Sequence, residues 1–408
     1  MVTTAPLIAD PPSSGSRSRH RAPWRSPADQ PRHARPALLA VAALAGALYS
    51  WNIGASSYHA FYADAVRSMT GSWKAFVFGS YDPAGTITLD KLPGFLWPQA
   101  LSARLFGFHP WALTLPQAVE GVLAVLVLFR TVRRWAGADA GLLAALAFTL
   151  TPVVAGLFRT AVEDPLFTLL LLLAADAGQR AARSGRLRTL LLAGVWVGAA
   201  FQAKMLEAWV VLPVLAAVYL LAAPVRLRRR LAHLALAGLV TVLVSASWML
   251  LATATPARDR PYIDGTTDNS AYSMVVGYNF LNRFSSVGLN AAETGSVTSS
   301  RGGGGSWGGT PQAAQGAAGA QRADRAAAAD GGAGDGGWTK MFSARFAPQT
   351  GWLYPLAAVS ALAAPPGAGG RRAPTRSGPG TCSGAVGSRS SSWCSARAAW
   401  AGTRTTWA

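Results

Sequence analysis

The chain is poor in charged residues and in cysteine, and it contains no run of alternating apolar and polar residues. Charged side chains make up 13% of its 408 residues, about half the share found in soluble domains. A soluble α/β enzyme would need about a dozen strands of alternating or β-branched pattern, and the sequence has none. Its two cysteines, Cys382 and Cys394, are too few for a metal site or a disulfide framework.

Apolar blocks of about 17 to 24 residues dominate the sequence, and this is the length of helix that crosses a lipid bilayer. We therefore predict an all-α polytopic membrane protein with a transmembrane bundle of about seven spans over residues 36–253. We expect a disordered segment at 1–35, an external loop at 54–110, and an external loop at 254–350 that contains a Gly/Ala-rich linker at 293–337. The predicted spans are 36–53, 111–130, 141–157, 166–177, 190–201, 209–223 and 231–253, and a further span starts at 351–364.

Basic residues outnumber acidic ones, which gives a net charge of +19. The arginines gather at 130–134, 180–188 and 226–230, between apolar blocks, as cytoplasmic loops do under the positive-inside rule. We therefore expect a plasma membrane protein with a cytoplasmic N-terminus, whose first span acts as an uncleaved signal-anchor. Nucleic acid is not an expected partner, because no basic face on a soluble domain exists to bind it.

The last stretch, residues 365–408, differs from the rest of the chain. It has no acidic residue, much Arg, Ser and Gly, and both cysteines. We predict that this tail is read out of frame and that the native chain continues with further spans, which the nucleotide sequence would test. A disordered basic cytoplasmic tail is the alternative.

Residues of both charge signs occur in four segments that the predicted topology places on the extracytoplasmic face. Charges of both signs close to lipid are costly unless they pair or bind a polar ligand. We expect these segments to converge on one cavity at the membrane surface, suited to a ligand with a lipid tail and an anionic head. The segments are the loop 58–97, the turns 159–164 and 204–207, and the loop 254–350.

Each charged residue in these segments has a structural interpretation beside the chemical one. Lys91, Arg159 and Lys204 could hold a phosphate, and Asp90 or Asp164 could act as a general base. Structural roles would instead make Asp164 a helix cap or a partner of Arg159, make Lys91 a snorkelling side chain, and pair Lys204 with its i+3 neighbour. A metal site at His59 is not expected, because no second histidine is suitably spaced.

Several motifs are similar to those of a known family. The run YADAVRSM, followed by DKLPGFLW, resembles the first external loop of the family 39 glycosyltransferases of the GT-C fold, which include protein O-mannosyltransferases and lipid A aminoarabinose transferases. Lys91 matches the lysine of the family's acidic-Lys-Pro-Pro motif and Asp90 its acidic neighbour, while Leu92 replaces the first proline and Pro93 keeps the second. The turn from 159 to 164 resembles the family's second element. The runs SWKAFVFGS, ITLDKLP and RPYIDGTTDNS resemble an actinobacterial branch named for mannosyl transfer, and the resemblance covers roughly 45–365.

The resemblance implies a GT-C-like helix bundle with a large first external loop. It also implies an inverting hexosyltransferase that moves a sugar, mannose or a related one, from a polyprenyl-phosphate donor to an acceptor hydroxyl on the extracytoplasmic face. The acceptor is a protein, a lipid or a glycan. No cofactor is required by the pattern, and dependence on a divalent cation is left open. Two alternatives are a multi-pass lipid or solute transporter (or flippase) and an inactive, truncated glycosyltransferase.

One departure from the family pattern concerns the base. Where relatives carry an acidic pair before the aromatic helix, this chain has Tyr58-His59. We therefore predict that the catalytic base is Asp164, Asp90 or Asp64, in that order. The residues expected to bind substrate are Lys91, Arg159, Lys204, Glu207, His59 and Tyr62.

Overall fold

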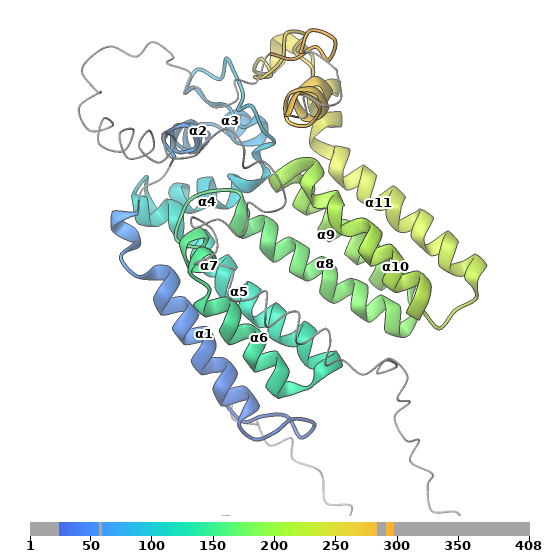
Figure 1. Cartoon of the computed structure of the whole chain (residues 1–408). Coiled ribbons are helices and arrows are strands. Elements are labelled where there is room, and N and C mark those ends of the chain that lie inside the picture. Colours follow the sequence, from blue (N-terminus) through green and yellow to red (C-terminus); the bar gives the residue numbers. More distant parts are fainter. Residues whose placement is uncertain (1–23, 57–58, 284–290, 298–408) are drawn as a thin grey trace, which may run out of the picture. The chain divides into compact units, whose positions relative to one another are not determined.

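The computed structural model describes residues 24–56, 59–283 and 291–297 (Figure 1). The predictions for the tail 365–408, the span at 351–364 and nearly all of the 293–337 linker lie outside these residues. Within the described part, the only strand-like pairings are isolated bridges, such as the one between Ile87 and Tyr262. The all-α fold class predicted from the sequence is confirmed.

A helix lies at each place where the sequence predicts a span. Within the described residues, four helical stretches, Ala34–Ala55, Pro110–Ala136, Leu187–Ala222 and Leu227–Ala254, are long and apolar enough to cross a membrane. The number of spans and their direction stay predictions. The helices at the predicted spans are α1 (Ala34–Ser50), α5 (Pro110–Ala136), α6 (Ala138–Leu150), α8 (Asp164–Ser184), α9 (Leu187–Lys204), α10 (Leu212–Ala222) and α11 (Leu227–Ala254).

One predicted span and one predicted turn differ from the observed structure. The span is divided at a proline, and the turn contains a strained residue. The predicted span 141–157 is divided, because α6 ends at Leu150 and the short α7 (Pro152–Leu157) begins at Pro152. Proline lacks the amide donor and keeps the preceding residue out of the helical region, so the helix cannot run through. The turn predicted at 204–207 is a 3-10 helix, Met205–Val211, between α9 and α10.

Helices α8, α9, α10 and α11 pack beside one another (Figure 1). Glycines allow the close crossing of α9 and α11: a Cβ added at Gly194 would lie 2.7 Å from the carbonyl oxygen of Ala237, and one at Gly198 would lie 2.6 Å from Cβ of Val244. Small residues of this kind let helix backbones approach in a membrane, where the hydrophobic effect does not drive association.

A buried carboxylate links α5 to α8 at the ends where both helices stop. Asp176 on α8 has no exposed surface, and its two oxygens accept from Nε and Nη2 of Arg130 on α5, at 3.0 and 2.9 Å. Arg134 also donates to Asp176, and Nε of Arg180 lies 3.1 Å from it. The sequence predicted only a topological role for these arginines, so the structure adds a packing role.

The loop between α1 and α5 forms three helices, α2 (Ala60–Gly71), α3 (Trp73–Phe78) and α4 (Trp97–Phe106). The apolar side of α2, with Tyr62, Ala65 and Met69, is buried in protein, in one cluster with Phe95 and Leu113.

Candidate functional site

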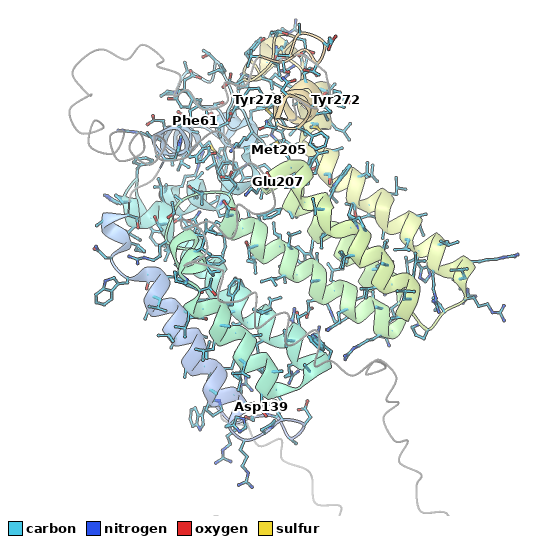
Figure 2. The ribbon with its side chains drawn as sticks, viewed as in Figure 1. Phe61, Asp139, Met205, Glu207, Tyr272 and Tyr278 are labelled. Carbon is cyan, nitrogen blue, oxygen red and sulfur yellow. The ribbon has the colours of Figure 1, made fainter. Side chains whose placement is uncertain are left out.

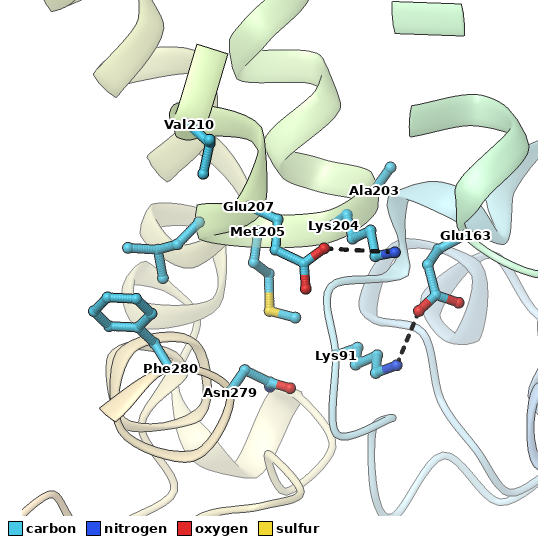
Figure 3. A pocket seen from close by; sticks show the side chains of 10 residues that line it. Lys91, Glu163, Ala203, Lys204, Met205, Glu207, Val210, Asn279 and Phe280 are labelled. Atoms are coloured by element: carbon cyan, nitrogen blue, oxygen red, sulfur yellow. Dashed lines mark hydrogen bonds and ion pairs between the residues drawn. The ribbon is translucent and has the colours of Figure 1, made fainter. Parts of the chain in front are cut away.

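A cavity of about 200 Å³ lies where α8 begins and α9 ends (Figure 3). Residues from all four mixed-charge segments line it, although these segments are far apart in the sequence. Figure 2 shows Met205 and Glu207 at this end of the helices and Asp139, in the first turn of α6, at the other end. The cavity is lined by Lys91, Glu163, Ala203, Lys204, Met205, Leu206, Glu207, Val210, Asn279 and Phe280.

Lys91 is the cation of the first loop, and two groups hold it. Its Nζ donates to the hydroxyl oxygen of Tyr62 at 2.6 Å and to Oε1 of Glu163 at 3.2 Å. Burial alone would lower the pKa of Lys91, but the charge of Glu163 and the contact with Tyr62 outweigh it, so the pKa is raised. Burial likewise raises the pKa of the Tyr62 hydroxyl. Lys91 is therefore a fixed positive charge in the cavity wall.

Lys204, the last residue of α9, is the second cation of the cavity. Its Nζ donates to Oδ1 of Asp164 at 2.7 Å and lies 3.5 Å from Oε2 of Glu207. The i+3 pairing that the sequence suggested is therefore present, together with a closer partner on α8. Figure 3 shows the pairs Lys204–Glu207 and Lys91–Glu163 within the cavity wall.

The helix breaks at Met205, directly after Lys204. Met205 has φ of 50° and ψ of −135°, a conformation that costs of order 1–3 kcal/mol in a residue with a side chain. Strain of this kind concentrates at functional sites, where the surrounding packing maintains it. At Met205 the break ends α9 beside the cavity and starts the 3-10 helix that carries Glu207.

Glu163 is a cavity residue that the sequence did not assign to the site. Its side chain lines the cavity and pairs with Lys91. Burial would raise the pKa of Glu163, but the charge of Lys91 lowers it below its usual value. The available signal was the adjacent pair Glu163-Asp164: two neighbouring carboxylates at a helix start point in different directions, so each can serve a different lysine.

The other predicted bases occupy different surroundings. The main-chain oxygen of Asp90 accepts from Nδ2 of Asn279 at 2.7 Å, and the carboxylate of Asp90 is close enough to raise the pKa of Lys91. Asp64 lies on the exposed side of α2, outside the residues that line the cavity. Asp164 and Asp90 are therefore the two predicted bases next to the lysines.

Arg159 and His59 lie outside the cavity lining. Nη2 of Arg159 donates to the main-chain oxygen of Trp51 at 2.6 Å, and Ser56 donates to the main-chain oxygen of Arg159. This arginine therefore joins the end of α1 to the turn before α8, instead of pairing with Asp164. His59 precedes α2 and packs its ring 4.9 Å from that of Tyr62, which contacts Lys91.

The segment after α11 closes one side of the cavity with Asn279 and Phe280, which sequence reasoning did not assign to the site. An internal network organises this segment, because Nη1 of Arg260 donates to Oδ1 of Asn269 at 2.6 Å, and Asn269 has φ of 57°. Oδ2 of Asp268 accepts from Ser273 at 2.7 Å. Asn269 and Asp268 thus act as turn residues.

The two lysines of the cavity can bind an anionic ligand. Lys91 and Lys204 line the hollow together with the carboxylates of Glu163 and Glu207, and Leu206, Val210 and Phe280 give it an apolar wall. A phosphate fits beside the lysines, since ammonium groups bind phosphate oxygens as point charges. Within the described residues, no group of three or more His, Cys, Asp or Glu side chains could hold a metal ion.

Comparison with known proteins finds one family model and several similar chains. Residues 90–249 match the family model described as "Dolichyl-phosphate-mannose-protein mannosyltransferase". The chain is similar to two Bacillus subtilis proteins, "Putative mannosyltransferase YycA" (35% identity over 59% of this chain and 35% of that protein) and "Putative mannosyltransferase YkcB" (38% identity over 55% and 31%). It is also 34% identical, over 41% of its length and 30% of the relative, to a Pseudomonas paraeruginosa "Undecaprenyl phosphate-alpha-4-amino-4-deoxy-L-arabinose arabinosyl transferase". No solved structure matches.

The matched stretch holds most of the cavity. It includes Lys91, Glu163, Asp164, Lys204 and Glu207, while the chain spans only about a third of the length of these relatives. The match of residues 90–249 to this family model agrees with the resemblance of the sequence motifs to the family 39 glycosyltransferases of the GT-C fold.

Proposed function

We propose that the protein is a membrane glycosyltransferase that moves a sugar, mannose or a related hexose, from a polyprenyl-phosphate donor to an acceptor hydroxyl. The observation that carries the proposal is the pair of lysines, Lys91 and Lys204, set among carboxylates in one cavity within the family segment. The cavity lies at the end of the helices opposite the arginine-rich turns, so the positive-inside rule puts it on the extracytoplasmic face of the plasma membrane.

The donor phosphate is bound by Lys91 and Lys204. Each lysine is paired with a carboxylate, at 3.2 and 2.7 Å. These pairs hold the two ammonium groups in place. A phosphate that enters shares their hydrogen bonds with Glu163 and Asp164. The exposed side chain of Val210, which also lines the cavity, gives the prenyl tail an apolar path toward the lipid.

The transfer proceeds by direct displacement. The acceptor oxygen attacks the anomeric carbon, the bond from that carbon to the phosphate oxygen breaks, and the prenyl phosphate leaves with the electron pair. The proton of the acceptor hydroxyl passes to a carboxylate, for which Asp164 is the first candidate and Asp90 the second. A single displacement inverts the anomeric centre. The developing charge on the leaving phosphate is stabilised by Lys91 and Lys204.

The test is transfer of label from polyprenyl-phosphate sugars in membranes that contain the chain. Lys91→Gln and Asp164→Asn are expected to lower transfer by about 10²-fold or more, because each removes a group that acts on the reacting atoms. Asp139→Asn, whose exposed carboxylate lies at the far end of the helices, is the matched control and retains full transfer. Full transfer by both cavity variants would refute the site, and Asp90→Asn decides between the two bases.

A lipid flippase is the second candidate, and Glu120 is the observation that favours it. This acid lies within α5, is 6% exposed, and its Oε2 has no hydrogen-bond partner among the described residues. An ionisable residue at such depth is typical of transport pathways. The same labelled donor separates the two functions: a flippase moves the labelled lipid between leaflets and leaves the sugar on its phosphate.

A further inference from the structure

The end of the helices opposite the cavity carries a basic surface of its own. The two turns that join α8 to α9 and α10 to α11, together with the helix ends that flank them, contain eight arginines, at 180, 183, 186, 188, 226, 228, 229 and 230. Asp176 is the sole acidic residue between Asp164 and Glu207, and none lies between Glu207 and Asp259. Because Asp176 already contacts three arginines, the charge of these turns is not compensated by the neighbouring sequence.

The two turns touch each other. Gly185 ends α8 with φ of 66°, and a Cβ added there would lie 2.8 Å from Cγ1 of Val225 and 3.5 Å from Cδ of Pro224. A side chain at 185 would therefore push the turns apart, and its absence lets both groups of arginines share one surface. Contact between two positively charged turns is unfavourable unless an anion lies close to them.

A hollow of about 640 Å³ opens on this surface, lined by Pro224, Val225, Arg226, Arg229 and Arg230. Arg230 is fixed in its wall, because Nε donates to the main-chain oxygen of Val225 at 2.7 Å and Nη1 donates to that of Leu220. Arg226 and Arg229 are exposed, and within the described part of the chain neither forms an ion pair. One guanidinium is thus held as part of the wall, and two are available to a ligand.

We propose that this hollow binds the phosphodiester headgroup of an anionic phospholipid from the leaflet at this end of the helices. A guanidinium presents two parallel donors to phosphate oxygens, which makes arginine suited to such a group. The flanking helices α10 and α11 expose apolar side chains such as Leu221 and Leu227 beside the hollow, and these contact the acyl chains. The site is separate from the cavity at Lys91 and does not depend on the proposed glycosyl transfer.

The experiment compares the binding of phosphatidylglycerol and phosphatidylcholine with identical acyl chains to the purified full chain in neutral detergent, by native mass spectrometry. The wild-type chain is expected to prefer phosphatidylglycerol, and R226Q/R229Q is expected to lose about tenfold or more of that preference. The control R32Q/R35Q removes the same charge from exposed arginines at the N-terminal side, outside the lining of the hollow, and keeps the preference. Arg228→Gln, on the same turn but outside the hollow, keeps it as well.

Three results would overturn the proposal. The preference could survive R226Q/R229Q, it could be lost equally in R32Q/R35Q, or millimolar inorganic phosphate could displace the lipid completely, which would identify free phosphate as the ligand. Folding is checked by the unfolding midpoint of each variant. If the double variant does not fold, Arg226→Gln and Arg229→Gln are measured singly, and an unchanged preference in both refutes the site.

Discussion

Helix α8 has an ionic cluster at each end, and the two differ in burial and in charge balance. At its start, Glu163 and Asp164 each pair with one lysine beside an open cavity. Near its end, Asp176 has no exposed surface and contacts three arginines. The first cluster is partly open and holds its charges in separate pairs, whereas the second concentrates three cations on one carboxylate.

The difference supports the proposal that the first cluster binds a ligand and that the second stabilises the fold. A buried carboxylate with three partners has no position left for a ligand, and it holds α5 against α8 at the depth where Thr131 also donates to it. The cavity pairs border empty space, so a phosphate can join them without displacing a packed side chain. Charge at a helix end is therefore informative about function only together with the space beside it.

Asp176→Asn should give the largest effect on the free energy of unfolding, because it removes the carboxylate of the buried cluster. It leaves Arg130, Arg134 and Arg180 without their shared counter-charge, and removal of one partner from a buried ion pair costs about 3–5 kcal/mol. The measurement is the free energy of unfolding in mixed detergent micelles. Asp139→Asn, at the same end but 76% exposed, is expected to change it by less than about 0.5 kcal/mol. Equal effects in the two variants would show that Asp176 has no special role in packing.

Glu163→Gln tests the cluster beside the cavity. Its effect on the free energy of unfolding should be smaller than that of Asp176→Asn. Both members of the Glu163–Lys91 pair are partly shielded, at 14% and 18% side-chain exposure, so we expect a coupling free energy of about 0.5–3 kcal/mol in a double-mutant cycle with Lys91→Met. The cycle uses the same unfolding measurement. A coupling near zero would mean that the pair is formed only loosely and that Tyr62 alone positions Lys91.

The pH dependence of the free energy of unfolding tests whether Glu163 and Lys91 form a charged pair. The pKa of Glu163 is lowered in the folded protein. Its contribution to the free energy of unfolding is therefore present above the pKa of the unfolded chain, about 4.3, and is lost as the pH falls through the folded-state pKa. The pKa of Lys91 is raised in the folded protein. Its contribution to the free energy of unfolding is therefore complete below the pKa of the unfolded chain, about 10.4, and is lost as the pH rises through the folded-state pKa.

The difference in unfolding free energy between the wild-type chain and Glu163→Gln should therefore be flat from about pH 5 to pH 9 and should shrink below about pH 4. A titration of unfolding from pH 3 to pH 9 measures it. A difference that disappears near pH 7 would show that Glu163 is not the titrating group.

The positions of the helices could be predicted from the sequence because bilayer-length apolar blocks leave few alternatives. The convergence of four mixed-charge segments followed from the same pattern, since the arginine clusters fix which ends lie together. Details failed where one residue overrides a pattern. Pro152 divides a predicted span, and Met205 breaks the chain into a 3-10 helix beside the cavity.

The pairing of charges could not be predicted, because it depends on tertiary packing and not on spacing. Asp164 and Glu163 are adjacent in the sequence, yet they serve different lysines. Arg159 lies five residues before Asp164, yet its guanidinium donates to the main chain of Trp51. Asp176 lies within an apolar block, and nothing in the spacing of the residues indicates that three arginines gather around it.

Glu207→Gln should give the smallest effect on the free energy of unfolding, because Glu207 is the most exposed carboxylate of the cavity cluster. The Glu207 side chain is 59% exposed and lies 3.5 Å from Lys204, its i−3 neighbour, and exposed pairs at this spacing contribute about 0.2–0.5 kcal/mol. Unfolding should barely change, because Asp164 holds the same lysine at 2.7 Å. If Glu207 instead contacts the bound donor, Glu207→Gln will alter the KM for the polyprenyl-phosphate sugar while stability stays the same. A loss of stability larger than that of Glu163→Gln would contradict this order and would place the main structural pair of the cavity at Lys204.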